Sequence, residues 1–242
     1  MRISIKMSSR KAIDYNKFNK YYIQSAIYSY LVGTKYENLH NYKSFKFFTF
    51  SDIFPSGDLN PGEEKNLIIS SPDEEFIRTL YENISSRGLF YLYDEVLEIN
   101  SVKVFNLNLH KIVFESGSPV VLYKESDNNR YFSFRRGDTL NFFLDRLKDN
   151  AIKKMRSFYG VEFDYDELLF DTLSFHKEVS IPLKKSNSNF IIIGTTWYKL
   201  EKTKLSREAK KFYSFIMEAG LGEKNSMGFG FVNPKREVLA NV

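Results

Sequence analysis

The stretch "KNLIISSPDEEFIRTLYENISSRG", Lys65–Gly88, indicates the fold because its hydrophobic period changes from that of a strand to that of a helix. The first seven residues predict a strand. We expect Ser71 to be the N-cap of the helix, Pro72 its first residue and Glu74 the returning partner of a capping box. Gly88 is expected to end the helix. The apolar stripe of this predicted helix comprises Phe76, Ile77, Leu80, Tyr81 and Ile84.

The segments on either side complete a βαββαβ order. "MRISIKM" (Met1–Met7) alternates apolar and polar residues and predicts a strand, and a helix is expected over about residues 16–31. "FKFFTFSDIF" (Phe45–Phe54) predicts the next strand. Two strand-like stretches follow Gly88, over residues 89–99 and 101–114. This order is typical of a ferredoxin-like domain.

The second half repeats the order less regularly. Strands are predicted at residues 119–125 and 130–135, followed by a helix over about 138–160. Two or three strands are expected between residues 163 and 200, then a helix from Ser206 to Gly220 and a closing strand at 229–234. We therefore predict an α+β protein of two tandem ferredoxin-like (RRM-like) domains, residues 1–114 and 115–242, with a glycine-rich loop near the C-terminus.

The composition narrows the function classes. The chain has 242 residues, of which 43% are hydrophobic and 17% aromatic, so it can form substantial cores. It has no cysteine, which excludes disulfides, thiolate catalysis and cysteine-based zinc sites. No apolar run approaches the roughly 20 residues of a membrane span, so we expect a cytoplasmic protein without membrane contact. The net charge of +5 fits a polyanionic partner and also an ordinary lysine-rich protein.

The loop "EAGLGEKNSMGFGFV" (Glu218–Val232) concentrates four glycines and one lysine between a predicted helix and a strand. It is neither a dinucleotide-binding fingerprint nor a Walker loop, because the glycine spacing fails and the helix precedes the loop. The dipole at this end of the helix would repel phosphate. A phosphate would therefore rely on backbone N–H groups and Lys224, and a plain connecting loop is the alternative.

The sequence of this loop, in a chain with two predicted ferredoxin-like domains, resembles the signature loop of the CRISPR-associated endoribonucleases that process precursor CRISPR RNA. These enzymes are the sixth family in the Cas series and belong to the RAMP superfamily. "YNKFNKYYIQSAIYSYL" (Tyr15–Leu31) and "LHNYKSFKFFTF" (Leu39–Phe50) are also similar to archaeal members. The resemblance implies that the loop holds RNA close to the cut, through Gly220, Gly222, Lys224, Asn225, Ser226, Gly228 and Gly230.

Three side chains in the first domain are candidates for chemistry. At 100° per residue, Tyr28 falls on the polar face of its helix, opposite the apolar stripe, although a loop or second domain covering it would explain the same position. His40 follows the helix, and Lys46 begins the next predicted strand. We interpret the other histidines, His110 in a predicted strand and His176 between strands, as structural or surface residues.

The family resemblance implies that Tyr28, His40 and Lys46 catalyse metal-independent cleavage without a cofactor. The ribose 2′-OH would attack the adjacent phosphorus, giving a 2′,3′-cyclic phosphate and a 5′-OH. His40 suits proton transfer near neutral pH and is favoured as the acid. Tyr28 would need a pKa lowered from about 10 to act as base, which Lys46 could bring about while stabilising the phosphorane. The roles of Tyr28 and His40 can be exchanged on this reasoning.

Basic side chains in the second half are candidates for RNA contact, although each also fits a solvated surface. The implied partner is repeat RNA within precursor CRISPR RNA. A homodimer and a loose association with an interference complex remain open, as do two rival functions: an RNA-binding module without cleavage, and a structural subunit of such a complex. The basic candidates are Arg135, Arg136, Lys153, Lys154, Arg156, Lys184 and Lys185.

Overall fold

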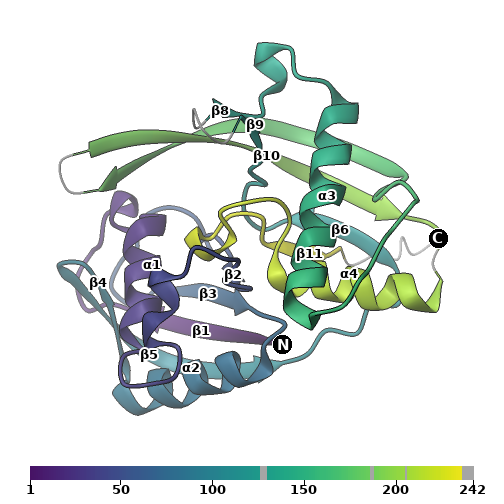
Figure 1. Cartoon of the computed structure of the whole chain (residues 1–242). Helices are drawn as coiled ribbons and strands as arrows, with labels where there is room; N and C mark the ends of the chain where they lie inside the picture. The colour runs from purple at the N-terminus through teal and green to yellow at the C-terminus, as the bar shows by residue number, and fades with distance from the viewer. Residues whose placement is uncertain (126–129, 186–187, 205, 236–242) are drawn as a thin grey trace, which may run out of the picture.

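Two antiparallel sheets, each packed against a pair of helices, form the protein (Figure 1). The computed structural model describes residues 1–125, 130–185, 188–204 and 206–235, without the side chains of residues 184, 185, 188, 189, 207 and 208. Among these residues, no helix is both long enough and apolar enough to cross a membrane.

The first sheet has the strand order β2-β3-β1-β5-β4. Without β4 this is the ferredoxin-like order, and β4 adds an edge strand through a hairpin with β5. Helices α1 and α2 cover one face, where alternate residues of β1 and β3 are completely buried. The elements are β1 (Arg2–Ser8), α1 (Lys20–Ser29), β2 (Thr49–Phe50), β3 (Glu64–Ser70), α2 (Glu74–Arg87), β4 (Leu89–Leu92) and β5 (Glu95–Phe105), with short 3-10 helices η1 (Tyr15–Lys17) and η2 (Glu37–Asn41).

The second sheet has the order β11-β6-β10-β9, again the ferredoxin-like arrangement. The prediction of two tandem ferredoxin-like units is therefore confirmed. The elements are β6 (Ile112–Ser116), β7 (Tyr123–Glu125), β8 (Arg130–Tyr131), η3 (Phe134–Arg136), α3 (Leu140–Tyr159), β9 (Thr172–Lys185), β10 (Ser188–Lys202), α4 (Arg207–Ala219), η4 (Asn225–Met227) and β11 (Val232–Pro234).

Several predicted boundaries differ from the structure. The N-cap of α2 is Asp73, whose carboxylate accepts from the backbone N–H of Phe76 at 3.1 Å; the hydroxyl of Ser71 instead donates to the carbonyl of Phe47. The strand predicted over residues 45–54 is reduced to the two residues of β2. The stretch 101–114 is divided, because residues from Ile112 pair in the second sheet. That sheet thus begins before the predicted boundary at 114/115, and His110 lies outside any strand.

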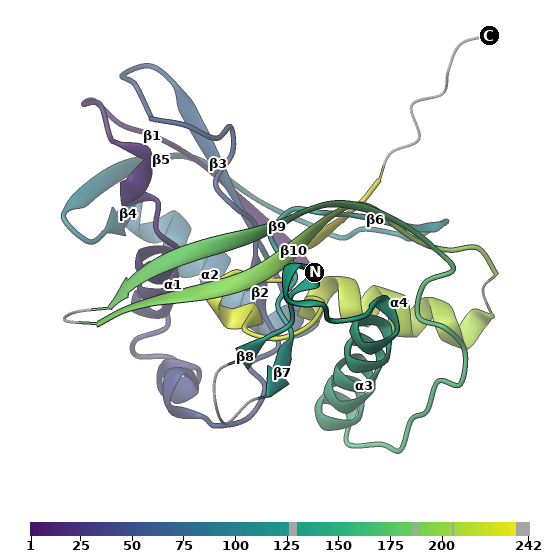
Figure 2. The ribbon, with the colours of Figure 1, turned by 90° about the horizontal axis from the view of Figure 1, so that it is seen from above.

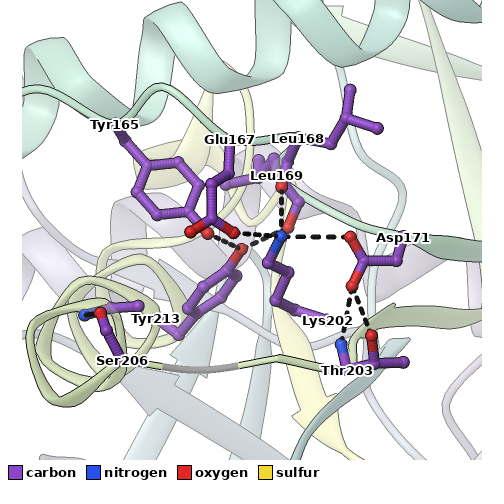
Figure 3. Close-up of polar contacts among 10 residues, drawn as sticks. Tyr165, Glu167, Leu168, Leu169, Asp171, Lys202, Thr203, Ser206 and Tyr213 are labelled. Carbon is purple, nitrogen blue, oxygen red and sulfur yellow. Dashed lines mark hydrogen bonds and ion pairs between the residues drawn. The ribbon is translucent and has the colours of Figure 1, made fainter.

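The segment between α3 and β9 has little regular structure but is fixed to the end of β10 by the buried Lys202 (Figure 3). Its ammonium contacts the carboxylates of Glu167 at 2.7 Å and Asp171 at 3.1 Å, and donates to the carbonyl of Leu168. Burial would lower the pKa of Lys202, but hydrogen bonds to the two carboxylates outweigh it and raise that pKa. This network closes the outer edge of the second core.

The two units meet around Arg2, the first residue of β1, whose side chain is buried against β11. Its guanidinium lies 4.5 Å from the centroid of the Phe231 ring and donates to the side-chain oxygen of Asn233 at 2.7 Å. Above this contact, the long β9–β10 hairpin extends from the second unit across α1 of the first (Figure 2). Side chains from both units consequently meet beside α1.

Candidate active site

Tyr28 is partly buried on the side of α1 that faces the glycine-rich loop, at the border of the first core. Asn19 caps the helix by accepting from the backbone N–H of Tyr21 at 2.8 Å, and Ile23 and Ile27 face inward. Among the described residues, the buried hydroxyl of Tyr28 has no hydrogen-bond partner. Burial raises the pKa of Tyr28 to about 12. The nearby Ser226 side chain lowers this pKa by a smaller amount, although it does not meet the geometry of a hydrogen bond. The phenol is therefore protonated at neutral pH.

His40 is brought to Tyr28 by the 3-10 helix η2. The centroids of the two rings are 5.1 Å apart, with an interplanar angle of 81°, so the rings meet edge to face. Leu39, its neighbour in η2, is buried in the core and anchors the turn, whereas His40 is exposed. An imidazole held this way has one side on a phenol and the other open to a substrate.

Lys46 enters the same site through an irregular backbone. It does not begin a strand, because Phe47 adopts a left-handed φ of 50°, an uncommon conformation for a bulky residue. The ring of Phe47 packs on Phe158 of α3 at 5.0 Å, while Phe48 is buried against Tyr28 at 5.9 Å. Burial lowers the pKa of Lys46, whose ammonium donates to the carbonyl of Tyr42 at 2.8 Å.

A pocket of about 280 Å³ unites these three side chains with residues of the second unit. Lys224, Ser226 and Met227 enter it from the glycine-rich loop, and Phe190 enters it from β10. The sequence predicted the catalytic set and the loop separately. It did not indicate Phe190, and Gln24, which binds the carbonyl of Ser226 at 2.9 Å, could have been found from the polar face of α1.

Lys154 of α3 holds the glycine-rich loop in place through hydrogen bonds. Only 3% of Lys154 is exposed, and its ammonium donates to the carbonyls of Gly220 and Gly222 and to the side chain of Asn225. The Asn225 amide in turn donates to Leu221 and Phe229 carbonyls, each at 3.0 Å. Lys154 and Asn225 therefore shape the loop, and an RNA contact by the nearly buried Lys154 remains a prediction.

The loop glycines are also explained by packing within the protein. A Cβ atom on Gly228 would lie 2.2 Å from the Phe50 ring, and one on Gly230 would lie 1.8 Å from the Leu221 carbonyl oxygen. Both residues have positive φ, as do Gly220 and Gly222. All four are buried and permit the fold of the loop, and an RNA contact through their backbone remains a prediction.

Lys224 is the partly exposed cation of the loop. It has a left-handed φ of 57°, and its ammonium lies 5.1 Å from the ring centroid of Tyr123 and 5.7 Å from that of Tyr131. These rings stack at 5.0 Å. The preceding residue, Glu223, accepts from Arg146 at 2.8 Å. The geometry holds the Lys224 charge at the mouth of the pocket, where it can meet a phosphate.

None of the remaining basic candidates whose side chains are described lines this pocket. Arg135 and Arg136 are exposed on η3. Lys153 is exposed and paired with Asp149 at 2.8 Å, and Arg156 contacts the carbonyl of Phe163. Lys184 and Lys185 end β9, but their side chains lie outside the described residues. An RNA contact by any of these residues remains a prediction.

Comparison with known proteins identifies the family to which this chain is similar. The family model described as CRISPR associated protein Cas6, C-terminal, matches residues 100–234. CRISPR-associated endoribonuclease Cas6 2 of Methanocaldococcus jannaschii is 43% identical over 240 residues, covering 97% of this chain and 99% of the relative. Cas6 1 of the same organism is 28% identical, covering 96% and 92%.

Solved structures agree over nearly the whole chain. One described as a CRISPR associated protein Cas6 is 25% identical with a TM-score of 0.70, covering 98% of this chain and 99% of that one. A protein described as the product of a Cas6-related gene from Pyrococcus furiosus has a TM-score of 0.72 at 23% identity, with the same coverage. A RAMP protein described as binding different RNA substrates has a TM-score of 0.70 at 24% identity, covering 98% and 100%.

Proposed function

This chain belongs to the Cas6 family of CRISPR-associated endoribonucleases, and we propose that it cleaves precursor CRISPR RNA within its repeats by a metal-independent transesterification. The observation that carries the proposal is the shared pocket of Tyr28, His40 and Lys46. In it, a phenol that has no hydrogen-bond partner among the described residues faces an exposed imidazole. These groups can exchange protons with a ribose–phosphate linkage and place a positive charge beside it.

The reaction needs one base, one acid and stabilisation of charge. The 2′-oxygen attacks the adjacent phosphorus while its proton passes to His40, and the bond from phosphorus to the 5′-oxygen breaks. Tyr28 gives its proton to the departing 5′-oxygen, so the products carry a 2′,3′-cyclic phosphate and a 5′-OH. Tyr28 then regains a proton from solvent and His40 releases its own.

The raised pKa of Tyr28 favours this assignment over the reverse one preferred from sequence. A phenol that titrates near 12 holds its proton at neutral pH and is poorly suited to remove one from a 2′-OH. The ammonium groups of Lys46 and Lys224, which line the same pocket, stabilise the negative charge of the phosphorane.

Incubation with repeat RNA from the same genome in the presence of a chelator tests the proposal. We expect cleavage within the repeat, with product ends identified by mass spectrometry as a cyclic phosphate and a 5′-OH. His40→Ala should abolish cleavage while RNA binding persists. Binding by the unaltered protein without any cutting would instead support an RNA-binding module, and a strict requirement for a divalent cation would overturn the proposed chemistry.

A further inference from the structure

We propose that a cluster of tyrosines on the outer side of α1, here called the tyrosine platform, binds unpaired bases of the RNA strand beyond the cleavage site. The platform comprises Tyr21 and Tyr22 of α1 and Tyr91 and Tyr93 of the β4–β5 hairpin. This inference rests on the proposed function and extends the substrate path outside the catalytic pocket.

The platform lines an open hollow of about 610 Å³, larger than the pocket that holds the catalytic set. Tyr93 is 76% exposed and Tyr91 is 47% exposed, so two large aromatic faces are open to solvent. Ser25 and Ser29 complete the lining on the helix side. Aromatic faces with neighbouring hydroxyl groups are suited to stacking and hydrogen bonding with nucleobases.

The backbone at Tyr93 holds its ring in place at an energetic cost. Tyr93 is the first of two residues that join β4 to β5, and its φ of 56° is one that glycine commonly provides in such a turn. Its ring stacks on Tyr22 with centroids 4.9 Å apart and planes inclined by 12°. Asp94, the second turn residue, pairs with Lys17 at 2.6 Å. Strain of this kind, at an exposed aromatic residue, points to a role in binding.

The platform is continuous with the candidate active site through Tyr21, which lines both hollows. The helix presents Tyr28 and Gln24 to the catalytic pocket and Tyr22 to the platform. An RNA strand that leaves the catalytic pocket past Tyr21 therefore reaches the stacked rings next.

A cation lies near the start of the hairpin that carries Tyr91 and Tyr93. The guanidinium of Arg87 stands 5.0 Å from the ring centroid of Tyr30, whose hydroxyl donates to the carbonyl of Leu89 at the start of the hairpin. Arg87 is exposed and can meet a phosphate of the strand. Stacked rings beside a positive charge are typical of sites for single-stranded nucleic acid, in which bases are unpaired and open to stacking.

Tyr93→Gly tests the platform without disturbing the fold, because glycine adopts the left-handed turn freely. Binding of repeat RNA is measured in a His40→Ala background, so that the RNA stays intact. We expect Tyr93→Gly to weaken binding by roughly 5- to 100-fold, the range for loss of one base–aromatic stack. Tyr81→Ala on α2, which removes another exposed tyrosine on a different surface, is the matched control and should bind as the parent does.

A second readout locates the contact. Repeat RNAs carrying 2-aminopurine at single positions should show one or two positions, next to the cut, whose fluorescence is quenched on binding and recovers with Tyr93→Gly. Binding by Tyr93→Gly within about twofold of the parent, or equal weakening by Tyr81→Ala, would overturn the platform. So would a change in self-association without a change in RNA binding, since a second copy would then occupy the surface. Cleavage by the unaltered protein is measured in parallel. If the unaltered protein does not cleave the RNA while Tyr93→Gly still weakens binding, the proposed cleavage reaction is contradicted and the platform is supported.

Discussion

The ring of Tyr28 meets the ring of His40 edge to face, with 5.1 Å between the centroids, although twelve positions separate the two in sequence. Helix α1 and the 3-10 helix η2 produce this contact by anchoring on the same core. The contact leaves the Tyr28 hydroxyl buried and without a partner among the described residues, which is costly for stability and useful for proton transfer.

Replacing Tyr28 by phenylalanine should separate stability from activity. Removing a buried hydroxyl that has no partner is expected to leave the free energy of unfolding unchanged or to raise it by about 1 kcal/mol. Single-turnover cleavage should fall by about 10²- to 10⁴-fold, because the proton donor is lost. Thermal unfolding and single-turnover rates measure the two effects, and a destabilised variant with full activity would contradict both expectations.

The pH dependence of cleavage should reveal which group is the base. With the pKa of Tyr28 raised to about 12, the folded protein keeps the phenol proton at pH values where the unfolded chain loses it. If Tyr28 is the acid and keeps its proton, the single-turnover rate does not rise between about pH 8 and pH 10. A rate that kept rising about tenfold per pH unit over that interval would make Tyr28 the base.

The same raised pKa affects stability at alkaline pH. A group whose pKa is higher in the folded state contributes stability below its unfolded pKa and loses it as pH rises toward the folded pKa. Tyr28 should therefore contribute to a fall in unfolding free energy between about pH 10 and pH 12. The slope over this range should be smaller in Tyr28→Phe than in the parent, measured by denaturant unfolding, and equal slopes would show that the phenol is not buried as described.

Lys154 and Lys153 are adjacent in sequence, but replacement by methionine should destabilise the protein much more at Lys154 than at Lys153. Lys154→Met leaves loop carbonyls without a donor and should cost about 2–4 kcal/mol of unfolding free energy, with loss of cleavage as the loop shifts. Lys153→Met removes only an exposed pair with Asp149 and should cost at most about 0.5 kcal/mol. Calorimetry of both variants tests the difference; similar melting temperatures would mean that Lys154 does not support the loop.

Gly228 can be compared with Gly33, since both have left-handed backbones but only Gly228 is crowded. Gly33→Ala, with φ of 76° and nothing within 4 Å of its Cβ, should cost about 1–2 kcal/mol from the backbone alone. Gly228→Ala places a methyl group against the Phe50 ring and should cost about 1–3 kcal/mol more. If the two variants unfold at the same denaturant concentration, packing against Phe50 does not explain the glycine.

Local patterns predicted the fold, and the structure brings Tyr28, His40 and Lys46, the set implied by the family resemblance, into one pocket; their catalytic roles remain a prediction. Apolar periodicity gave the repeated βαββαβ order, and the polar side of α1 pointed to Tyr28. Other features depend on contacts that no local pattern encodes. Asp73 caps α2 because the hydroxyl of Ser71 donates to the carbonyl of Phe47, in another segment. Phe47 can hold its left-handed backbone because its ring packs on α3.

The loop shows the same limit. Its glycines and lysine suggested direct contact with RNA, and the sequence gives no sign that Lys154 and Phe50 fill the space around them. The close packing around Gly228 and Gly230 explains these glycines within the protein, and their contact with RNA remains a prediction. Lys224 and Ser226 are partly exposed in the pocket, and the role expected for them from sequence also remains a prediction.

The linker between Phe105 and Ile112 joins two halves of the chain. The first half carries Tyr28 and His40, and the second carries Lys224 and Phe190. A gene severed within that linker would yield two fragments, neither of which contains a complete pocket. Mixing the fragments should restore cutting only as far as they reassociate around Arg2. Such a split protein would work as a reporter of proximity, silent until its halves are brought together.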